Sequence, residues 1–292
     1  MNQSAAARRA FSRAASTYDR HAALAAEIGQ RLIERLDGLR FEAEVIADFG
    51  CATGRQSLAL HKRYPGARLL ALDSSQAMLT EARRRRGWWK RRFELVCGEI
   101  ESLPLAADCL DLAFVNLSLH GCIAIDQALT SLRRVLRPGG LLLLSVPGLD
   151  TLKELRLAWQ QIEPESTRIM RFTDAQRLGS ALTRAGFAEP VLDTDWLQTR
   201  HDTPHDLLNT LKRSGFANTD ADRPRGLTHP QCLGRVLEAL VAQAAERDSL
   251  TASWEVVYAS AWAPEHGQPI RGDQGEEVSV PISKIGIRRR DP

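Results

Sequence analysis

The sequence has few of the residues that build disulfide frameworks and metal sites. Its 292 residues include only five cysteines, none of them in a C-x-x-C pair, and seven scattered histidines. Each cysteine lies in or beside an apolar stretch: Cys51, Cys97, Cys109, Cys122 and Cys232. This distribution predicts buried, reduced thiols in a reducing compartment, and it argues against a zinc site. We therefore expect no bound metal.

Targeting and membrane signals are also missing. The stretch MNQSAAARRAFSRAAS lacks the apolar core of a signal peptide, and no apolar run approaches the roughly 18 residues of a membrane span. With 43% hydrophobic and 26% charged residues, the composition is that of an ordinary globular protein of one large domain or two. We expect a cytoplasmic protein without a membrane partner.

Lysine is scarce, because 34 of the 39 basic residues are arginines. Arginine suits bidentate contact with carboxylates and phosphates, although a GC-rich genome would give the same bias. The net charge of +3 is too small for a general nucleic-acid binder. Seven basic residues nevertheless gather in the run Arg83–Arg92. Three interpretations stay open for this run: a docking surface for an acidic partner, a nucleic-acid contact with Trp88 and Trp89 as stacking platforms, or a helix end whose charges complement the macrodipole.

From Val45 onward, short apolar runs alternate with amphipathic segments. The runs are Val45–Phe49, Leu69–Leu72, Phe93–Cys97, Leu110–Val115 and Leu141–Val146. Between them, helical periodicity marks Gln76–Arg86 and Gln127–Leu136. Strands of this length, each followed by a helix, predict an α/β fold with a doubly wound parallel sheet covered on both faces.

Outside this region the pattern is more helical. Residues 1–40 predict helix, as do 151–163, 173–185 and most of 204–250. Val191–Leu197 and Trp254–Trp262 are predicted to return to the sheet as strands.

Ligand-type residues follow four consecutive predicted strands. The first strand ends in Asp48-Phe49-Gly50-Cys51-Ala52-Thr53-Gly54, in which the glycines permit a tight turn and close approach of a ligand. The other three strand ends carry Asp73 and Ser74, then Glu99 and Ile100, then Asn116. An acidic residue in the position of Asp73 can accept hydrogen bonds from ribose hydroxyls, and an adenine ring fits beside Glu99. Because that edge of such a sheet binds ligands, the four together predict a nucleoside site.

Each of these residues also has a purely structural interpretation. Asp73 can instead cap a helix that starts near Ser75. Gly50 and Gly54 can be ordinary turn glycines, and Asn116 can simply close a turn.

The glycine spacing distinguishes between cofactors. A dinucleotide site requires G-x-G-x-x-G, whereas this sequence has G-x-A-x-G followed by Arg55 and Gln56. That motif resembles the first motif of class I S-adenosylmethionine-dependent methyltransferases, usually D-x-G-x-G-x-G. The segment ALDSSQAML resembles their second motif and RRVLRPGGLLLLSVPG their last, so the resemblance covers residues 44–148.

A narrower resemblance runs nearly from end to end. The segments ARRAFSRAASTYDRHAAL, LDTLKELR, ALTRAGFAEPVLD and SWEVVYASAWAP are similar to those of the malonyl-acyl-carrier-protein O-methyltransferases of biotin synthesis. The resemblance implies a Rossmann-like, mostly parallel seven-stranded sheet. It also implies four segments: an N-terminal helical lid (1–40), the methyltransferase core (41–200), a helical cap (201–250), and the last strand with a tail (251–292).

The resemblance implies methyl transfer from S-adenosylmethionine to the free carboxylate of malonyl-acyl carrier protein, an early step toward the pimeloyl precursor of biotin. It implies that the cofactor is bound by Asp48, Gly50, Ala52, Gly54, Asp73, Ser74, Glu99, Ile100 and Asn116. Acyl carrier proteins are acidic, so the run Arg83–Arg92 is a candidate docking patch near the pocket mouth.

No proton-transfer residue is expected, because a malonyl carboxylate is already ionised at neutral pH. The site does require a cation for that carboxylate, and Arg156 and Arg171 are the candidates; otherwise they form surface ion pairs. Trp262 is a weaker candidate for the substrate pocket and otherwise belongs to the core. Tyr18 is expected in the lid.

The sequence departs from the family pattern where a pocket is expected. Ala52 replaces the middle glycine, and at a positive φ it would carry about 1–3 kcal/mol of strain. Glu99 stands in place of Asp and Ser260 in place of His. His120-Gly121 stands in place of Gln-Trp, so an aromatic wall beside the cofactor is expected to be missing. Two alternatives therefore stay open: a catalytically silent paralogue, and a methyltransferase for another small molecule or RNA.

Overall fold

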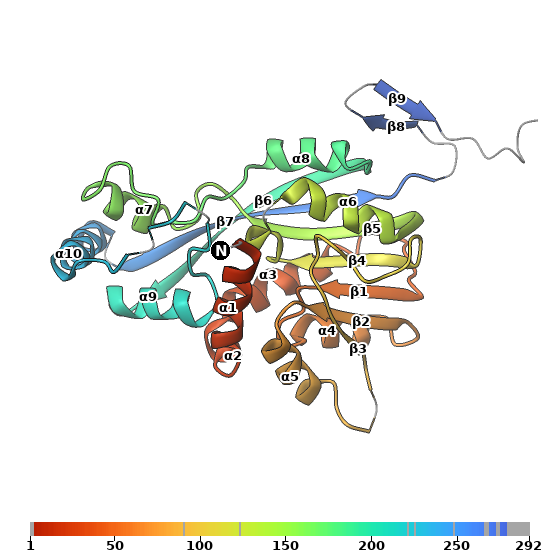
Figure 1. The fold of residues 1–292 in the computed structure, drawn as a ribbon, viewed down its shortest axis with the longest axis horizontal. Coiled ribbons are helices and arrows are strands. Elements are labelled where there is room, and N and C mark those ends of the chain that lie inside the picture. Colours follow the sequence, from red (N-terminus) through yellow and green to blue (C-terminus); the bar gives the residue numbers. More distant parts are fainter. Residues whose placement is uncertain are drawn as a thin grey trace, which may run out of the picture.

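The computed structural model describes residues 3–89, 91–122, 124–220, 222–224, 226–247, 249–265, 269–272 and 275–278. Within this part of the chain, a seven-stranded sheet has the strand order β3-β2-β1-β4-β5-β7-β6 (Figure 1). The strands are β1 Val45–Phe49, β2 Arg68–Asp73, β3 Glu94–Cys97, β4 Leu110–Asn116, β5 Leu136–Pro147, β6 Ala188–His201 and β7 Leu250–Trp262. Strands β1 to β5 pair in parallel, and β7 runs antiparallel between β5 and β6. The predicted doubly wound, mostly parallel fold is confirmed.

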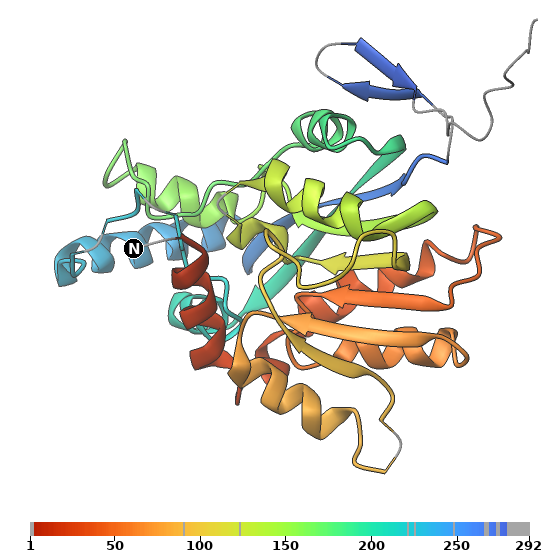
Figure 2. The same ribbon diagram turned by 45° about the vertical axis from the view of Figure 1, so that its right-hand side comes forward.

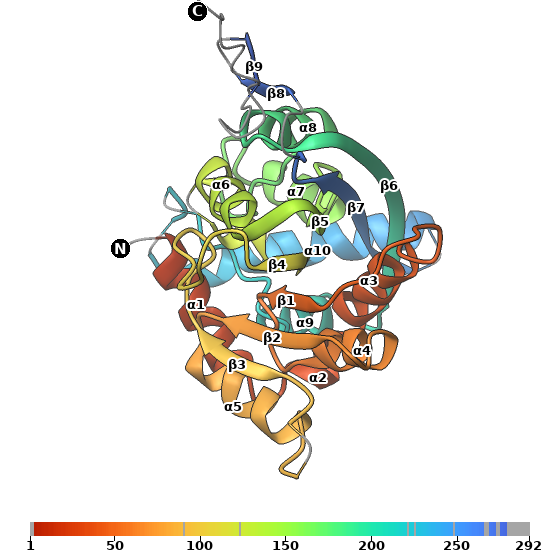
Figure 3. The same cartoon turned by 90° about the vertical axis from the view of Figure 1, so that its right-hand side faces the viewer.

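Helices cover both faces of the sheet. They are α1 Gln3–Ala14, α2 Tyr18–His21, α3 Ala23–Glu34, α4 Arg55–Arg63, α5 Gln76–Arg85, α6 Ile125–Val135, α7 Lys153–Gln160, α8 Ala175–Arg184, α9 Pro204–Arg213 and α10 Pro230–Arg247. Apolar residues of α3, α4 and α5 pack on one face of the sheet, and those of α6 and α8 pack on the other. Figure 3 shows α3 and α4 on the opposite side of the strands from α6. Two-faced burial explains why the central strands are continuous apolar runs.

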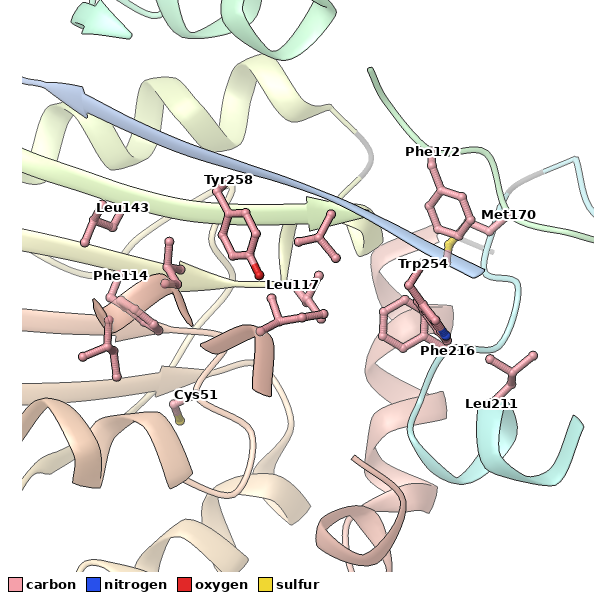
Figure 4. Close-up of a cluster of buried hydrophobic side chains, with 14 of the residues drawn as sticks. Cys51, Phe114, Leu117, Leu143, Met170, Phe172, Leu211, Phe216, Trp254 and Tyr258 are labelled. Carbon is pink, nitrogen blue, oxygen red and sulfur yellow. The ribbon is translucent and has the colours of Figure 1, made fainter. Parts of the chain in front are cut away.

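The apolar core follows the two-residue period of the strands. In β1, Ile46 faces the α3–α5 layer and Ala47 faces the α6–α8 layer. The first layer continues along β4 and β5 through Phe114 and Leu143, and Tyr258 of β7 belongs to the same cluster (Figure 4).

The register brings the carboxyl ends of the parallel strands to one edge. Phe49 at the end of β1 lies between Leu72 of β2 and Val115 of β4. Asp73 in turn pairs with Cys97 at the end of β3. The residues that follow these strands are therefore neighbours in space, as the sequence predicted.

The helical segments at the two ends of the chain flank this edge. Helix α1 lies beside the carboxyl ends of the central strands (Figure 2). The predicted helical stretch of residues 1–40 consists of three helices, α1 to α3. Along the chain, helices α9 and α10 come after β6 and before β7, where a helical cap was predicted. A short hairpin of β8 Pro269–Gly272 and β9 Gly275–Val278 follows β7. No helix of the described residues is long and apolar enough to span a membrane.

Candidate active site

A pocket lies at the carboxyl edge of β1, β2, β3 and β4. Seven of the predicted cofactor residues line it: Gly50, Ala52, Asp73, Ser74, Glu99, Ile100 and Asn116. Asp48 lines an adjoining smaller pocket together with Arg55, and Gly54 begins α4 beside it. The structure thus brings together residues from four separate strand ends. Among the described residues, no group of three or more His, Cys, Asp or Glu side chains is arranged to hold a metal.

The loop after β1 is left-handed at three positions. Gly50, Ala52 and Gly54 have φ angles of 71°, 47° and 76°. A Cβ atom on Gly50 would lie 2.0 Å from the Ser118 hydroxyl oxygen, so glycine is required there for space as well as for backbone conformation. Ala52 adopts a conformation that costs an L-residue about 1–2 kcal/mol. The positive φ is the condition under which the sequence predicts strain at this departure from the family motif.

The Asp73 carboxylate organises the loop. Its Oδ2 accepts a hydrogen bond from the Ala52 backbone N–H at 2.9 Å, and its Oδ1 accepts one from the Ser75 N–H at 2.7 Å. Burial raises the pKa of Asp73 to about 6, and the carboxylate is still mostly ionised at neutral pH. The cap of α5 is Ser75 itself, whose hydroxyl accepts from the Met78 N–H. Because each carboxylate oxygen has two lone pairs, Asp73 retains acceptor capacity for ribose hydroxyls.

Asp48 is buried beneath the same loop. Its Oδ2 accepts a hydrogen bond of 2.5 Å from the Ser57 hydroxyl in α4. Burial raises the pKa of Asp48 to about 7, and the nearby negative charge of Asp73 acts in the same direction. Asp48 thus fastens α4 to the end of β1, in addition to lining the smaller pocket.

The N-terminal helices close over the pocket. Arg8 of α1 forms an ion pair of 2.9 Å with Glu99, the residue expected beside an adenine. The hydroxyls of Ser12 and Ser75 lie 2.8 Å apart. Phe11 and Tyr18 contribute their rings to the pocket lining, and burial raises the pKa of Tyr18 well above its ordinary value, so its hydroxyl stays protonated.

Asn116 has a structural role besides its place in the pocket. Its amide nitrogen donates to the backbone oxygen of Ala25 in α3 at 2.8 Å, and its Oδ1 accepts from the Ser145 hydroxyl at 2.8 Å. Asn116 therefore ties α3 to the ends of β4 and β5. The simple strand-end turn that the sequence also allowed does not describe this role.

The sequence is similar to known methyltransferases along its whole length. A protein-family profile described as "Methyltransferase domain" matches residues 47–144. Over 290 residues the chain is 41% identical to the malonyl-(acyl-carrier protein) O-methyltransferase of Xylella fastidiosa (strain M23), covering 97% of this chain and 96% of that protein. It is 39% identical over 265 residues to the protein of that name from Gallionella capsiferriformans (strain ES-2), covering 89% and 90% of the two chains. The chain belongs to the malonyl-(acyl-carrier protein) O-methyltransferase family.

Solved structures share its fold at low sequence identity. The YcgJ protein of Bacillus subtilis superposes with a TM-score of 0.57 at 17% identity, covering 81% of this chain and 99% of that one. Phosphoethanolamine N-methyltransferase 2 of Haemonchus contortus, solved with S-adenosyl-L-methionine, gives 0.53 at 15% identity, covering 81% and 52%. Fold and family together place the chain among the class I S-adenosylmethionine-dependent methyltransferases.

An aromatic wall lies at the departure His120-Gly121, but only its Phe11 lines the cofactor pocket, so the expectation of a missing wall beside the cofactor stays a prediction. The His120 ring stacks on Phe216 with centroids 4.7 Å apart and an interplanar angle of 12°. Phe11 lies 6.2 Å from the same imidazole. Burial lowers the pKa of His120 to about 4, so the ring is neutral at physiological pH. Phe216 comes from the loop after α9, and no local sequence signal marks it as a pocket neighbour.

The structure does not bring the three substrate candidates to one site. Arg156 donates from Nη2 to the backbone oxygens of Leu149 and Thr151, which fixes its own loop. Arg171 borders a separate hollow shared with His120, and its guanidinium pairs with Asp222.

Trp262 lies at the opposite edge of the sheet. It pairs with Leu141 near the start of β5 and contacts the ring of Phe41 edge-on. The structure therefore places Trp262 away from the pocket, in the position that a core residue would take. Ser260, two residues earlier in β7, pairs with Leu143 within the sheet.

The basic run also lies at the far edge. The run begins in the last turn of α5 and continues through the loop that joins α5 to the start of β3, so Arg91 and Arg92 lie at the amino edge of the sheet rather than near the pocket mouth. Trp88 and Trp89 are 92% and 91% exposed there. Arg85 differs from its neighbours because its guanidinium forms an ion pair with Asp19 of α2, in the N-terminal lid. This placement contradicts the prediction that the run steers a carrier to the pocket mouth.

Proposed function

We propose that this protein uses S-adenosylmethionine to convert the free carboxylate of malonyl-acyl carrier protein to its methyl ester, an early step of biotin synthesis. The observation that carries the proposal is the similarity, over 97% of the chain, to an enzyme named for this reaction. The strand-end pocket described above supports it, because its donors and acceptors match an adenosine and an amino acid group.

The pocket residues divide between the two halves of the cofactor. Asp73 would accept hydrogen bonds from the ribose hydroxyls, and Glu99 would accept one from the adenine amino group, with Ile100 against the base. Gly50, Ala52 and Ser74 would contact it mainly through their backbone. Asp48, Gly54 and Asn116 would shape the methionine side, where the exposed Arg55 offers a positive charge to the amino acid carboxylate. When bound, S-adenosylmethionine supplies a methyl group on a positively charged sulfur.

Methyl transfer to a carboxylate requires alignment and exclusion of water rather than a base. The malonyl carboxylate is ionised at neutral pH, so the substrate carries no proton that the neutral His120 would need to remove. The lid and the aromatic wall of Phe11, His120 and Phe216 shield the region between the pocket and the cap helices. The residues of this chain thus bind, orient and desolvate the two reactants.

Arg171 is the better of the two candidates for holding the carboxylate. The Arg171 side chain is 73% exposed, and its guanidinium pairs with Asp222. Such a surface pair contributes little free energy. An incoming carboxylate can therefore compete with Asp222. Arg156 is less available, because two backbone carbonyl oxygens already accept from its Nη2.

The direct test is methyl transfer to malonyl-acyl carrier protein, followed by intact mass spectrometry of the carrier. We expect one added methyl group, and none on acetyl-acyl carrier protein, which lacks a free carboxylate. Asp73→Ala should abolish transfer at low cofactor concentration. No transfer beside an active family member would refute the proposal and favour the silent paralogue. Transfer to a different small acid or to RNA would instead support the third interpretation.

A further inference from the structure

A cluster of exposed cations lies at the same side of the molecule as the pocket. Arg20 is on α2, and Lys212 and Arg213 end α9; all three are exposed. Helix α9 packs beside α1 and α2 (Figures 1 and 2). The packing is close, since a Cβ atom on Gly215, just after α9, would lie 2.4 Å from the Phe11 ring. Burial lowers the pKa of His21, and the positive charges of Arg213 and Arg20 lower it further.

These cations have no acidic partners within the described part of the chain. The one carboxylate on α2, Asp19, is already engaged by Arg85. Some other arginines of the described residues are neutralised by acidic partners, for example Arg84 by Glu81 and Arg168 by Glu163. An unneutralised cluster of this kind attracts an acidic macromolecule and orients it on approach.

The cluster adjoins an apolar hollow that is separated from the cofactor pocket by the rings of Phe216, His120 and Phe11. Lys212 borders this hollow, which has a volume of about 400 Å³ and is lined by Trp159, Met170 and Phe216 among others. Figure 4 shows Phe216, Met170 and Trp254 grouped between α9 and the first part of β7. Phe216 in turn stacks on His120, which contacts Phe11 of the pocket lining. A flexible thioester arm from a protein bound at the cluster would thus reach the ring stack that borders the cofactor pocket.

We propose that Arg20, Lys212 and Arg213 form the surface on which the acidic acyl carrier protein docks. The inference rests on the proposed function and assigns its protein partner to the α2–α9 face. It replaces the run Arg83–Arg92, whose residues Arg91 and Arg92 lie at the amino edge of the sheet.

The test compares two charge-reversal pairs with the same change in net charge. Arg20→Glu/Arg213→Glu alters the proposed surface, and Arg91→Glu/Arg92→Glu alters the basic run as a matched control. Each is assayed with malonyl-acyl carrier protein and with malonyl-pantetheine, which carries the same thioester without the protein. Direct binding of the carrier is measured separately by fluorescence anisotropy.

For Arg20→Glu/Arg213→Glu we expect a fall of about tenfold or more in the ratio of kcat/KM on the carrier to kcat/KM on malonyl-pantetheine. This is the size of effect expected when two close charge pairs between the proteins are reversed. The Kd for the carrier should rise in parallel, and raising the salt concentration should reproduce the effect in the unaltered protein. The control pair should change the ratio less than about twofold.

Three results would overturn the docking surface: an equal change in both pairs, a change in the control alone, or an equal loss on both substrates. Tighter binding of RNA than of the carrier, lost in the α2–α9 pair, would also overturn it. Failure of the proposed function is distinguishable from failure of the docking surface, because the unaltered protein itself would then transfer no methyl group to either substrate.

Discussion

Asp19 of the lid forms an ion pair with Arg85 at the end of α5. The same guanidinium donates to the backbone oxygen and the hydroxyl of Thr53, and that hydroxyl donates to Asp19 at 2.7 Å. The three residues therefore connect the lid, the loop after β1 and α5. Since the loop holds the Asp73 side of the pocket, this connection couples closure of the lid to the cofactor site.

Arg85→Ala is expected to loosen the lid and weaken cofactor binding. The side chains of Arg85 and Asp19 are 23% and 38% exposed, so the pair is partly screened and worth about 1 kcal/mol. That corresponds to roughly a fivefold rise in the Kd for S-adenosylhomocysteine by calorimetry. Arg84→Ala serves as the control, because Arg84 pairs only with Glu81 on the surface of α5. Equal effects of the two substitutions would contradict a specific role for Arg85.

Ala52→Gly is expected to tighten cofactor binding and stabilise the protein. The substitution relieves the left-handed strain at φ 47° and removes a Cβ atom from the pocket lining. Glycine adds conformational entropy to the unfolded chain, so the net gain in the free energy of unfolding is about 1 kcal/mol or less.

Calorimetry of S-adenosylmethionine binding and urea denaturation together check this prediction. Ala107→Gly is the control, since Ala107 lies in an exposed turn outside the left-handed region and should lose stability. Unchanged cofactor affinity in Ala52→Gly would show that the missing glycine does not compromise the pocket.

Cofactor affinity is expected to depend on pH through Asp73. Burial raises the pKa of this carboxyl to about 6 in the cofactor-free protein, and only the ionised form offers all its lone pairs as acceptors. Affinity should therefore fall as the pH is lowered through about 6 and should be constant above about 7. Asp73→Asn should bind weakly and lack this dependence. An inflection that persists in Asp73→Asn would assign the titration to another group, with Asp48 as the first candidate to test.

Residues near strand ends were predictable because the topology brings them together. Asp73, Gly50 and Glu99 follow parallel strands, and parallel strands present their carboxyl ends at one edge. Their side chains were placed correctly without knowledge of any contact. The sequence left the sign of φ at Ala52 open, and the structure shows that it is positive, as is common where a motif usually has glycine.

Strand direction decides the position of two other predicted site features. The run Arg83–Arg92 precedes a parallel strand, and a loop in that position lies at the amino edge. Trp262 ends a strand antiparallel to β5, so it falls at the amino edge as well. Residue type alone favours a place near the pocket for both, and strand direction excludes it.

Other site neighbours left no local trace in the sequence. Arg8, Asp19 and Phe216 come from helices and loops far from the strands, and their positions depend on how α1, α2 and α9 pack. The left-handed conformation of Leu117, at φ 50°, is likewise set by hydrogen bonds to Ser145 rather than by any property of leucine. Such contacts are tertiary, and residue patterns do not determine them.

His120 is expected to act through its shape and not as a base. Its ring stacks on Phe216, its pKa is lowered to about 4, and its Nδ1 is buried without a hydrogen-bond partner among the described residues. His120→Phe should therefore retain methyl transfer, and it should be as stable as the unaltered protein because it removes an unpaired buried nitrogen. His120→Ala should lose about 2 kcal/mol of unfolding free energy, since it opens a cavity in the stack. The rates of methyl transfer by the unaltered protein and by His120→Phe should be independent of pH between about 6.5 and 8, because the ionised substrate carboxylate needs no base. If His120→Phe folds and binds cofactor normally yet loses transfer more than about a hundredfold, the imidazole takes part in the chemistry and this interpretation is wrong.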